Sequence, residues 1–281
     1  MRCVGQHGTP RRDRWIGRVG ILLLLSFCRT LRLSGGELTL QVPELPKEPG
    51  KSVIFDLPGL PSGAKPLELV LVPGSSSVKP FFMGKYEVTQ GQYEAVTHTN
   101  PAFYKKGPDY PVDRVNWYDA QEFCRRLTAS LSAKPNGQFR FRLPTDAEWS
   151  VAVGLPEESG NTPKEKDSKI KDVYPWGTQW PPPKGAGNYY PSLKVDSFDT
   201  ASPVGSFKPN QYGLYDLGGN VWEWCEDWYD QNQKHRVVRG ASWGDLGPNY
   251  LLSSFHNCFI PDGRNGDIGF RVVLEVVESV R

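Results

Sequence analysis

Short apolar runs bounded by proline and glycine predict strands at several points along the chain. The clearest of these runs are Leu38–Val42, Ser52–Phe55, Leu67–Val72, Phe139–Leu143 and Gly269–Val277. Apolar or alternating runs between turn-forming residues are typical of strands. The run that ends at Val72 continues directly into Pro73 and Gly74, which is a strong turn signal.

Three segments have the pattern of helices instead. The strongest begins at residue 116 or 117, and its apolar positions recur at steps of three and four residues: Ala120, Phe123, Cys124, Leu127 and Leu131. This spacing places them on one face of a helix. Thr89 is a natural N-cap for a helix over Gln90–Thr97, and Thr145 is one for a short helix over Asp146–Val151.

Regular structure becomes scarce after the third predicted helix. Residues 155–172 are charged and poor in apolar side chains, which predicts a solvated surface loop. The chain has 29 glycines and 25 prolines, which disfavour long regular elements, and nine tryptophans, which can fill a core between loops. We therefore predict an α+β fold with few helices on small antiparallel sheets, in one domain over residues 66–277.

Two segments precede this domain. Residues 37–65 alternate apolar stretches with proline, which predicts a linker or a set of edge strands. Residues 1–36 contain a nine-residue apolar run, Val19–Phe27, with arginines on both sides. A membrane-spanning helix takes about 20 apolar residues, so no transmembrane span is expected. The run fits a secretory signal, which predicts an exported protein, periplasmic or secreted. If the leader is a mis-assigned start, the protein is cytoplasmic.

Charge and cysteine content narrow the class further. The body of the chain has more acids than bases and no basic stripe with interleaved aromatic residues, so nucleic-acid binding is not expected. Three cysteines lie outside the leader, Cys124, Cys225 and Cys258, and none forms a CxxC pair. A structural zinc site is therefore not expected. One disulfide among the three stays open, but buried free thiols are the preferred interpretation.

Seven segments, in order, resemble the formylglycine-generating enzyme family, also called the sulfatase-modifying factor family. They are Gly84–Thr89, Pro111–Trp117, Arg142–Trp149, Tyr174–Gly177, Tyr212–Trp224 (YGLYDLGGNVWEW), Arg239–Trp243 and Gly269–Arg271. The resemblance implies a C-type-lectin-like fold with little regular structure and with bound calcium. The tryptophans of these segments are then the core of a loop-rich fold.

Two calcium sites follow from the resemblance. In the first, Asp216 and Glu223 bind through side chains and Gly219 and Val221 through carbonyl groups. In the second, Asn188 and Asp196 bind through side chains and Tyr189 and Phe198 through carbonyl groups. Carboxylates that bracket carbonyl groups in a tight loop match the oxygen ligands that calcium requires. The alternative is ordinary turn capping by Asp and Asn.

The catalytic positions depart from the family pattern. Active members have two cysteines after the Arg239–Trp243 segment, and their thiolates bind copper(I). The corresponding residues here are Asp245 and Tyr250. Copper(I) requires soft sulfur ligands, so copper is not expected at these positions. The pattern favours a member without formylglycine-generating activity. An oxidoreductase that forms formylglycine in sulfatases, or oxidises protein cysteines by a divergent route, is the alternative.

The segment from Trp243 to Arg264 resembles the variable surface of ligand-binding members of the family. With its neighbours it offers a polar and aromatic set typical of recognition surfaces: Ser242, Trp243, Asp245, Asn249, Tyr250, His256, Asn257, Arg264 and Asn265. The alternative is a solvated loop over the sheet. We predict a calcium-stabilised binding module for a protein or glycan ligand, with a sulfatase as one candidate partner.

Overall fold

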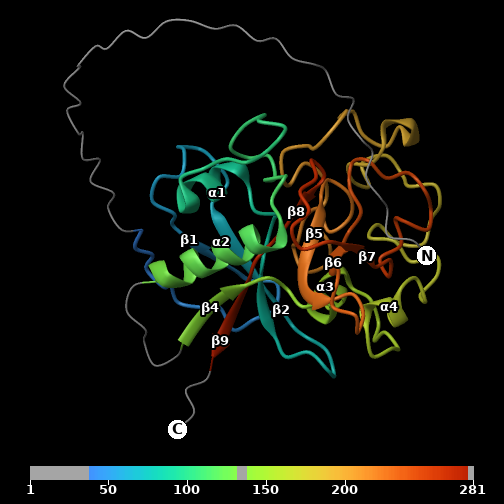
Figure 1. Ribbon diagram of the computed structural model, residues 1–281, viewed down its shortest axis with the longest axis horizontal. Helices are drawn as coiled ribbons and strands as arrows, with labels where there is room; N and C mark the ends of the chain where they lie inside the picture. Colours follow the sequence, from blue (N-terminus) through green and yellow to red (C-terminus); the bar gives the residue numbers. More distant parts are fainter. Residues whose placement is uncertain (1–37, 132–137, 278–281) are drawn as a thin grey trace, which may run out of the picture. The chain divides into compact units, whose positions relative to one another are not determined.

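The computed structural model describes residues 38–131 and 138–277 of the 281-residue chain. The predicted leader, residues 1–36, lies outside the described residues. In the part of the chain that is described, no helix combines the length and the apolar character needed to cross a membrane. Two small sheets and a few short helices make up the regular structure, and long loops connect them (Figure 1).

The larger sheet has five strands in the order β1-β2-β3-β9-β4. Their bounds are β1 (Ser52–Phe55), β2 (Leu67–Val72), β3 (Phe81–Gly84), β4 (Gln138–Arg142) and β9 (Val273–Val277). All four pairings are antiparallel. The last strand of the domain, β9, therefore lies between β3 and β4, and closes the sheet with residues from both ends of the domain. The strands predicted at Ser52–Phe55 and Leu67–Val72 are confirmed with the same bounds.

The smaller sheet has four strands in the order β7-β6-β5-β8. Their bounds are β5 (Trp222–Trp228), β6 (Arg236–Arg239), β7 (Asn257–Phe259) and β8 (Ile268–Gly269). The pairs β5–β6 and β6–β7 are antiparallel, whereas β8 pairs with β5 in parallel. The predicted α+β fold with few helices on small, mainly antiparallel sheets is confirmed.

The three predicted helices are confirmed, and each begins at a capping box. They are α1 (Gln90–Thr97), α2 (Trp117–Ser130) and α3 (Asp146–Val153), and their N-caps are Thr89, Asn116 and Thr145. Each cap side chain accepts from a backbone N–H in the first turn, which satisfies a donor that the helix itself leaves open. The remaining helical segments are short: α4 (Pro163–Lys166) and the 3₁₀ turn η1 (Pro191–Leu193).

Aromatic side chains join the helices to the sheets. α2 lies against α1 and β4 (Figure 1). Tyr93 of α1 stacks on Phe123 of α2 with ring centroids 5.5 Å apart, and both rings meet Phe270 edge to face. Such rings bury a large apolar area, which is the main stabilising contribution where regular structure is sparse.

Two predicted strands differ from the structure. Leu38–Val42 forms no strand, because Leu40 meets Leu131 beyond the end of α2 in an isolated bridge and not a sheet edge. Gly269–Val277 is not continuous, because β8 belongs to the smaller sheet and β9 to the larger one. The chain crosses between the sheets at residues 270–272.

The segment of residues 155–172 is more firmly anchored than a solvated loop. It contains α4, and the Oε2 atom of Glu158 accepts from the Ser150 hydroxyl at 2.6 Å. The Asp167 carboxylate accepts from the backbone N–H of His256 at 3.1 Å, and Ser168 donates its N–H to the carbonyl group of Ser254. Glu158 thus attaches this loop to α3, and Asp167 and Ser168 attach it to the segment before β7.

We expect the substitution Thr145→Ala to lower the free energy of unfolding by about 1 kcal/mol, because it removes the N-cap of α3. Urea denaturation followed by circular dichroism measures the change. Thr162→Ala, which removes the cap of the four-residue helix α4, is the matched control and should change stability by less than about 0.5 kcal/mol. Equal losses in the two variants would contradict the assignment of α3 as a stabilising element.

Candidate functional site

The loop before β5 turns sharply at the residues predicted to bind calcium. Asp216, Gly219 and Asn220 have φ angles of 55°, 85° and 61°, in the left-handed region. Gly219 has no room for a side chain, because a Cβ atom there would lie 2.2 Å from the carbonyl oxygen of Asn188. Asn188 and Gly219 form an isolated parallel bridge. The structure therefore brings the two predicted calcium loops side by side.

Glu223, the last member of the first predicted set, is held in a buried salt bridge. Its Oε1 atom accepts from Arg271 Nη2 at 2.5 Å, and its Oε2 atom accepts from Arg271 Nε at 2.7 Å. The indole N–H of Trp149 donates to Oε2 at 3.0 Å. The Arg271 and Glu223 side chains are 0% and 1% exposed, so each charge depends on the other for its stabilisation.

Asp216 and Glu87 add two buried carboxyl groups to this cluster without a matching base. Burial raises the pKa of Asp216 to about 6, although the backbone N–H of Gly205 donates to its Oδ2 atom at 2.6 Å. Burial and the neighbouring carboxylate of Asp216 raise the pKa of Glu87 well above its usual range. Within the described chain, neither carboxylate has a basic group in salt-bridge contact. Beside Arg271 the cluster has two more acids than bases.

The second predicted set also contains an acceptor without a donor. Asp196 accepts from the backbone N–H groups of Tyr189 and Phe198 at 3.1 and 2.8 Å. Asn188 donates from Nδ2 to the carbonyl oxygen of Thr200 at 2.9 Å, but its buried Oδ1 atom has no hydrogen-bond partner in the described chain. A buried acceptor without a partner is costly, which makes it an available ligand for a cation or an ordered water.

The chemistry of both sets fits calcium. All the donors are oxygens, from Asp216 and Glu223 with nearby carbonyl groups in one set and from Asn188 and Asp196 in the other. Calcium takes six to eight such oxygens from carboxylates and carbonyl groups. A divalent cation in the first set would balance the excess acids beside Arg271, and a cation in the second set would pair with the Asn188 Oδ1 atom. Glu223 would contribute while keeping its salt bridge, since a carboxylate can accept more than two contacts.

Asp245 occupies the first position where active family members have a cysteine. Its Oδ2 atom accepts from the backbone N–H and the hydroxyl of Ser242, at 2.9 and 2.8 Å. The same hydroxyl lies 3.4 Å from Asp267 Oδ2. Burial raises the pKa of Asp245 to about 6 and also raises the pKa of Asp267. A hydrogen-bonded carboxylate therefore lies where copper(I) would require a thiolate.

Tyr250 occupies the second cysteine position and is 44% exposed, with its ring edge to face against Phe255 at 5.2 Å.

Two cysteines, Cys124 and Cys225, are buried free thiols, as expected from the sequence. Burial raises the pKa of both thiols, which keeps them protonated and unreactive. Cys258 is buried in β7.

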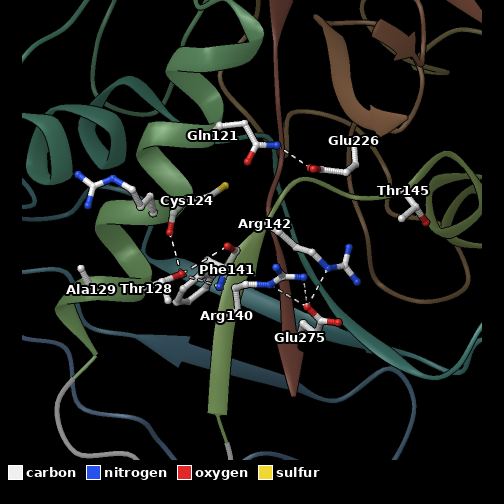
Figure 2. A pocket seen from close by; sticks show the side chains of 11 residues that line it. Gln121, Cys124, Thr128, Ala129, Arg140, Phe141, Arg142, Thr145, Glu226 and Glu275 are labelled. Carbon is white, nitrogen blue, oxygen red and sulfur yellow. Dashed lines mark hydrogen bonds and ion pairs between the residues drawn. The ribbon is translucent and has the colours of Figure 1, made fainter. Parts of the chain in front are cut away.

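Cys124 contributes to the wall of a cavity of about 620 Å³ beside α2 and β4 (Figure 2). Figure 2 shows that two arginines of this cavity face the Glu275 carboxylate: Arg140 and Arg142 donate to it at 2.6 and 3.4 Å. Arg142 also forms a two-point pair with Glu148, with both distances at 2.7 Å. The Cys124 thiol is therefore protonated in this cavity, and the guanidinium groups of Arg140 and Arg142 are paired with carboxylates.

The nine residues predicted for the ligand face lie at different depths. Four are exposed: Asn249, Tyr250, Arg264 and Asn265. Three are half-buried: Trp243, Asp245 and Asn257. Ser242 and His256 are buried, so they do not reach a surface ligand. The Trp243 ring meets Tyr104 edge to face at 5.7 Å, and the Arg264 guanidinium pairs with Asp119.

His256 belongs to a buried polar cluster. Its Nδ1 atom lies 2.8 Å from the carbonyl oxygen of Ser254, and its Nε2 atom lies 2.9 Å from Arg239 Nη1. Asp146, Glu158 and His256 place ligand atoms within 4.8 Å of one another, which is a spacing that a metal ion could use. However, the Arg239 guanidinium donates to Asp146 inside this group and is already its cation. We interpret the cluster as a structural salt bridge.

The fold and the site together define a loop-rich, C-type-lectin-like domain. Residues 71–276 match the sulfatase-modifying factor enzyme 1-like domain, and the chain belongs to this FGE-sulfatase family.

The chain resembles two relatives in sequence and one solved structure in fold. It is 30% identical over 229 residues to the chaperone protein LppX of Paenibacillus barcinonensis, covering 70% of this chain and 81% of the relative. It is 35% identical over 178 residues to the inactive C-alpha-formylglycine-generating enzyme 2 of Bos taurus, covering 58% of this chain and 50% of that protein. PvdO from Pseudomonas aeruginosa has a similar fold, with a TM-score of 0.58, 23% identity and coverage of 82% of this chain and all of that one. The chain thus spans about half the length of the bovine relative.

Sequence reasoning missed several of the buried partners that shape the site. Glu87 accepts from Asn220 Nδ2 at 2.6 Å and from the backbone N–H of Val221 at 3.1 Å, which fixes the calcium-site loop from the far side. Glu87 and Arg271 lie within segments that resemble the family, and a charged residue between apolar neighbours was the available signal. The partner of each residue, Asn220 for Glu87 and Glu223 for Arg271, could not be read from the sequence, because it lies far away along the chain.

We expect Asp245→Asn to raise stability at pH 7–8 by about 1–2 kcal/mol, with little effect near pH 4. The raised pKa means that the folded chain holds more protons than the unfolded chain between about pH 4 and 6. Stability therefore falls as the pH rises through this window, and an amide removes that loss. Urea denaturation across the pH range, in chelator-treated protein, measures the effect. The exposed substitution Asp262→Asn is the control, and an equal pH profile in both variants would contradict the assignment.

Proposed function

We propose that this chain is a non-catalytic member of the FGE-sulfatase family, stabilised by calcium, that binds a protein or glycan ligand. The Asp245 carboxylate carries the proposal, because it lies at the first cysteine position with both contacts to Ser242 formed. A carboxylate and an exposed phenol at the two positions do not provide the dithiolate that copper(I) needs. In the described chain, the free thiols of Cys124 and Cys225 are buried and protonated.

The ligand face that we propose is the exposed part of the Trp243–Arg264 segment. Tyr250 and Leu246 expose 44% and 49% of their surfaces, and the neighbouring Phe103 exposes 62%. Gly266 lies between Trp243 and the Phe103–Tyr104 pair, because its backbone carbonyl accepts from Trp243 and a Cβ atom on it would lie 3.3 Å from the Tyr104 ring. Exposed aromatic residues with adaptable polar neighbours are typical of recognition surfaces.

The relatives support a protein partner. LppX is named as a chaperone, and the bovine relative is named as an inactive formylglycine-generating enzyme. Binding another protein without modifying it is therefore compatible with this scaffold. A sulfatase is one candidate partner, because active family members act on sulfatases. We further propose that the protein is exported, where millimolar calcium can fill sites of modest affinity.

We expect calcium to raise the melting temperature of chelator-treated protein. Binding to the folded state alone stabilises it by about 2.7 kcal/mol when calcium is 100-fold above its dissociation constant. Differential scanning calorimetry with and without calcium measures the shift. Asp216→Asn should weaken the response, whereas Asp56→Asn, at an exposed position outside both loops, should leave it intact. An unchanged melting curve in the wild-type protein would refute the calcium assignment.

We expect no conversion of a Cys-x-Pro-x-Arg peptide to formylglycine in the presence of copper(I), oxygen and reductant. The physical reason is the absence of sulfur at positions 245 and 250. Mass spectrometry of the peptide measures conversion, and an active family member provides the positive control. Peptide binding without conversion would identify sulfatase segments as the partner. Conversion would establish the divergent oxidoreductase and overturn the non-catalytic proposal.

A further inference from the structure

A cavity of about 750 Å³ opens beside the first calcium loop. Its buried wall includes Asp216, Leu217 and Gly218, and its exposed rim includes Lys184 and Lys208. The volume lies within the usual range of small-molecule sites, about 300–1,000 Å³. It is separate from the cavity of Figure 2, with which it shares no lining residue.

The aromatic wall of this cavity is rigid. Trp176 is half-buried and stacks in parallel on Tyr174, with ring centroids 4.9 Å apart. Its indole N–H donates to the carbonyl oxygen of Gln179 at 2.9 Å, and Tyr189 packs edge to face against it at 5.4 Å. Because these contacts fix the ring before any ligand arrives, binding against it loses little conformational entropy.

Much of the rest of the wall is made of glycine backbone, prolines and apolar side chains such as Phe207 and Leu214. A Cβ atom on Gly187 would lie 2.6 Å from the carbonyl oxygen of Gly218. The backbone segments at these two glycines are therefore in close contact, and they add no side chain to the cavity there. Pro175, Pro183 and Pro209 add apolar surfaces with little flexibility. A wall with the rings of Trp176 and Phe207 and three prolines suits the apolar face of a flat or ring-shaped ligand.

The charges at the rim select an anionic ligand. Lys184 and Lys208 are exposed, and in the described chain neither ammonium group lies within salt-bridge distance of an acid. Asp216 is the one acid among the lining residues, and it is a proposed calcium ligand. With that charge neutralised by calcium, the cavity is positive. This step rests on the proposed function.

We infer that this cavity binds an anionic sugar residue, with the sugar ring against Trp176 and the acidic group at Lys184 and Lys208. A uronate and a sulfate ester share the required chemistry, which is a ring with an apolar face and one negative charge. Lysine recognises either group as a point charge. The cavity is a second site in addition to the proposed ligand face.

Isothermal titration with four probes, in calcium buffer, tests the assignment. Glucuronate and glucose 6-sulfate should bind at least about tenfold more tightly than glucose, which lacks the charge, and than inorganic sulfate, which lacks the ring. The stronger of the two anionic sugars identifies the source of the charge. Equal affinity for glucose, or for inorganic sulfate, would overturn the inference.

Two double lysine variants, one inside the cavity and one outside it, provide a matched test and control. Lys184→Glu/Lys208→Glu should weaken binding of the anionic sugars at least about tenfold, whereas Lys51→Glu/Lys79→Glu, at exposed positions outside the cavity, should not. All four positions are exposed, so folding is preserved and a melting curve verifies it. Trp176→Leu should weaken sugar binding without changing affinity for inorganic sulfate. Unchanged sugar binding in the first double variant would overturn the inference.

Calcium separates this inference from the proposed function. Sugar binding that is lost on chelation supports both. A protein that calcium stabilises but that binds none of the sugars overturns the cavity assignment and leaves the calcium proposal intact. Sugar binding that persists on chelation, in a protein that calcium does not stabilise, supports the cavity and contradicts the calcium proposal.

Discussion

The salt bridge between Arg271 and Glu223 holds the two sheets together. Arg271 lies where the chain crosses from β8 to β9, and its guanidinium contacts both oxygens of Glu223 in β5. It also donates to the carbonyl oxygen of Gly84 in β3 at 3.1 Å and to that of Tyr215 at 3.0 Å. One buried side chain thus connects the larger sheet, the smaller sheet and the start of the calcium loop. Removal of either partner would leave a buried charge unpaired, which typically costs about 3–5 kcal/mol.

This arrangement also leaves two buried carboxyl groups beside the proposed calcium loop without a matching base. Arg271 neutralises Glu223 alone, while Asp216 and Glu87 lie nearby with raised pKa values. Two buried acids without a matching base lower the stability of the fold, because each costs desolvation free energy. The divalent cation that we propose would balance these acids and would couple the conformation of the loop to calcium binding. The left-handed backbone conformations at Asp216 and Gly219 form the turn of this loop.

Local signals made the helices and several strands predictable from the sequence. Thr89, Asn116 and Thr145 act within four residues of their own positions, so the helix starts could be read directly. The break at residues 270–272 could not, because it depends on which sheet each half joins. The burial of His256, which the sequence predicts on the ligand face, also depends on a long-range contact. Its partner Asp146 lies 110 residues away, and only the folded chain shows that the pair is buried. The resemblance predicts the calcium loops, but it does not predict the contacts of Glu87 and Arg271 with the residues of the first loop.

The buried contacts that stabilise this fold involve other residues than the two positions at which active family members have cysteines. The contacts of Arg271 and Glu87 serve the fold, and they are independent of the residues at positions 245 and 250. Asp245 accepts two hydrogen bonds from Ser242, so the loop at the first cysteine position forms an ordered turn without sulfur. Tyr250 packs on Phe255 and is free to contact a partner. The fold therefore forms without sulfur at positions 245 and 250. The same loop is then left with an acid and an exposed aromatic ring, which are groups suited to recognition.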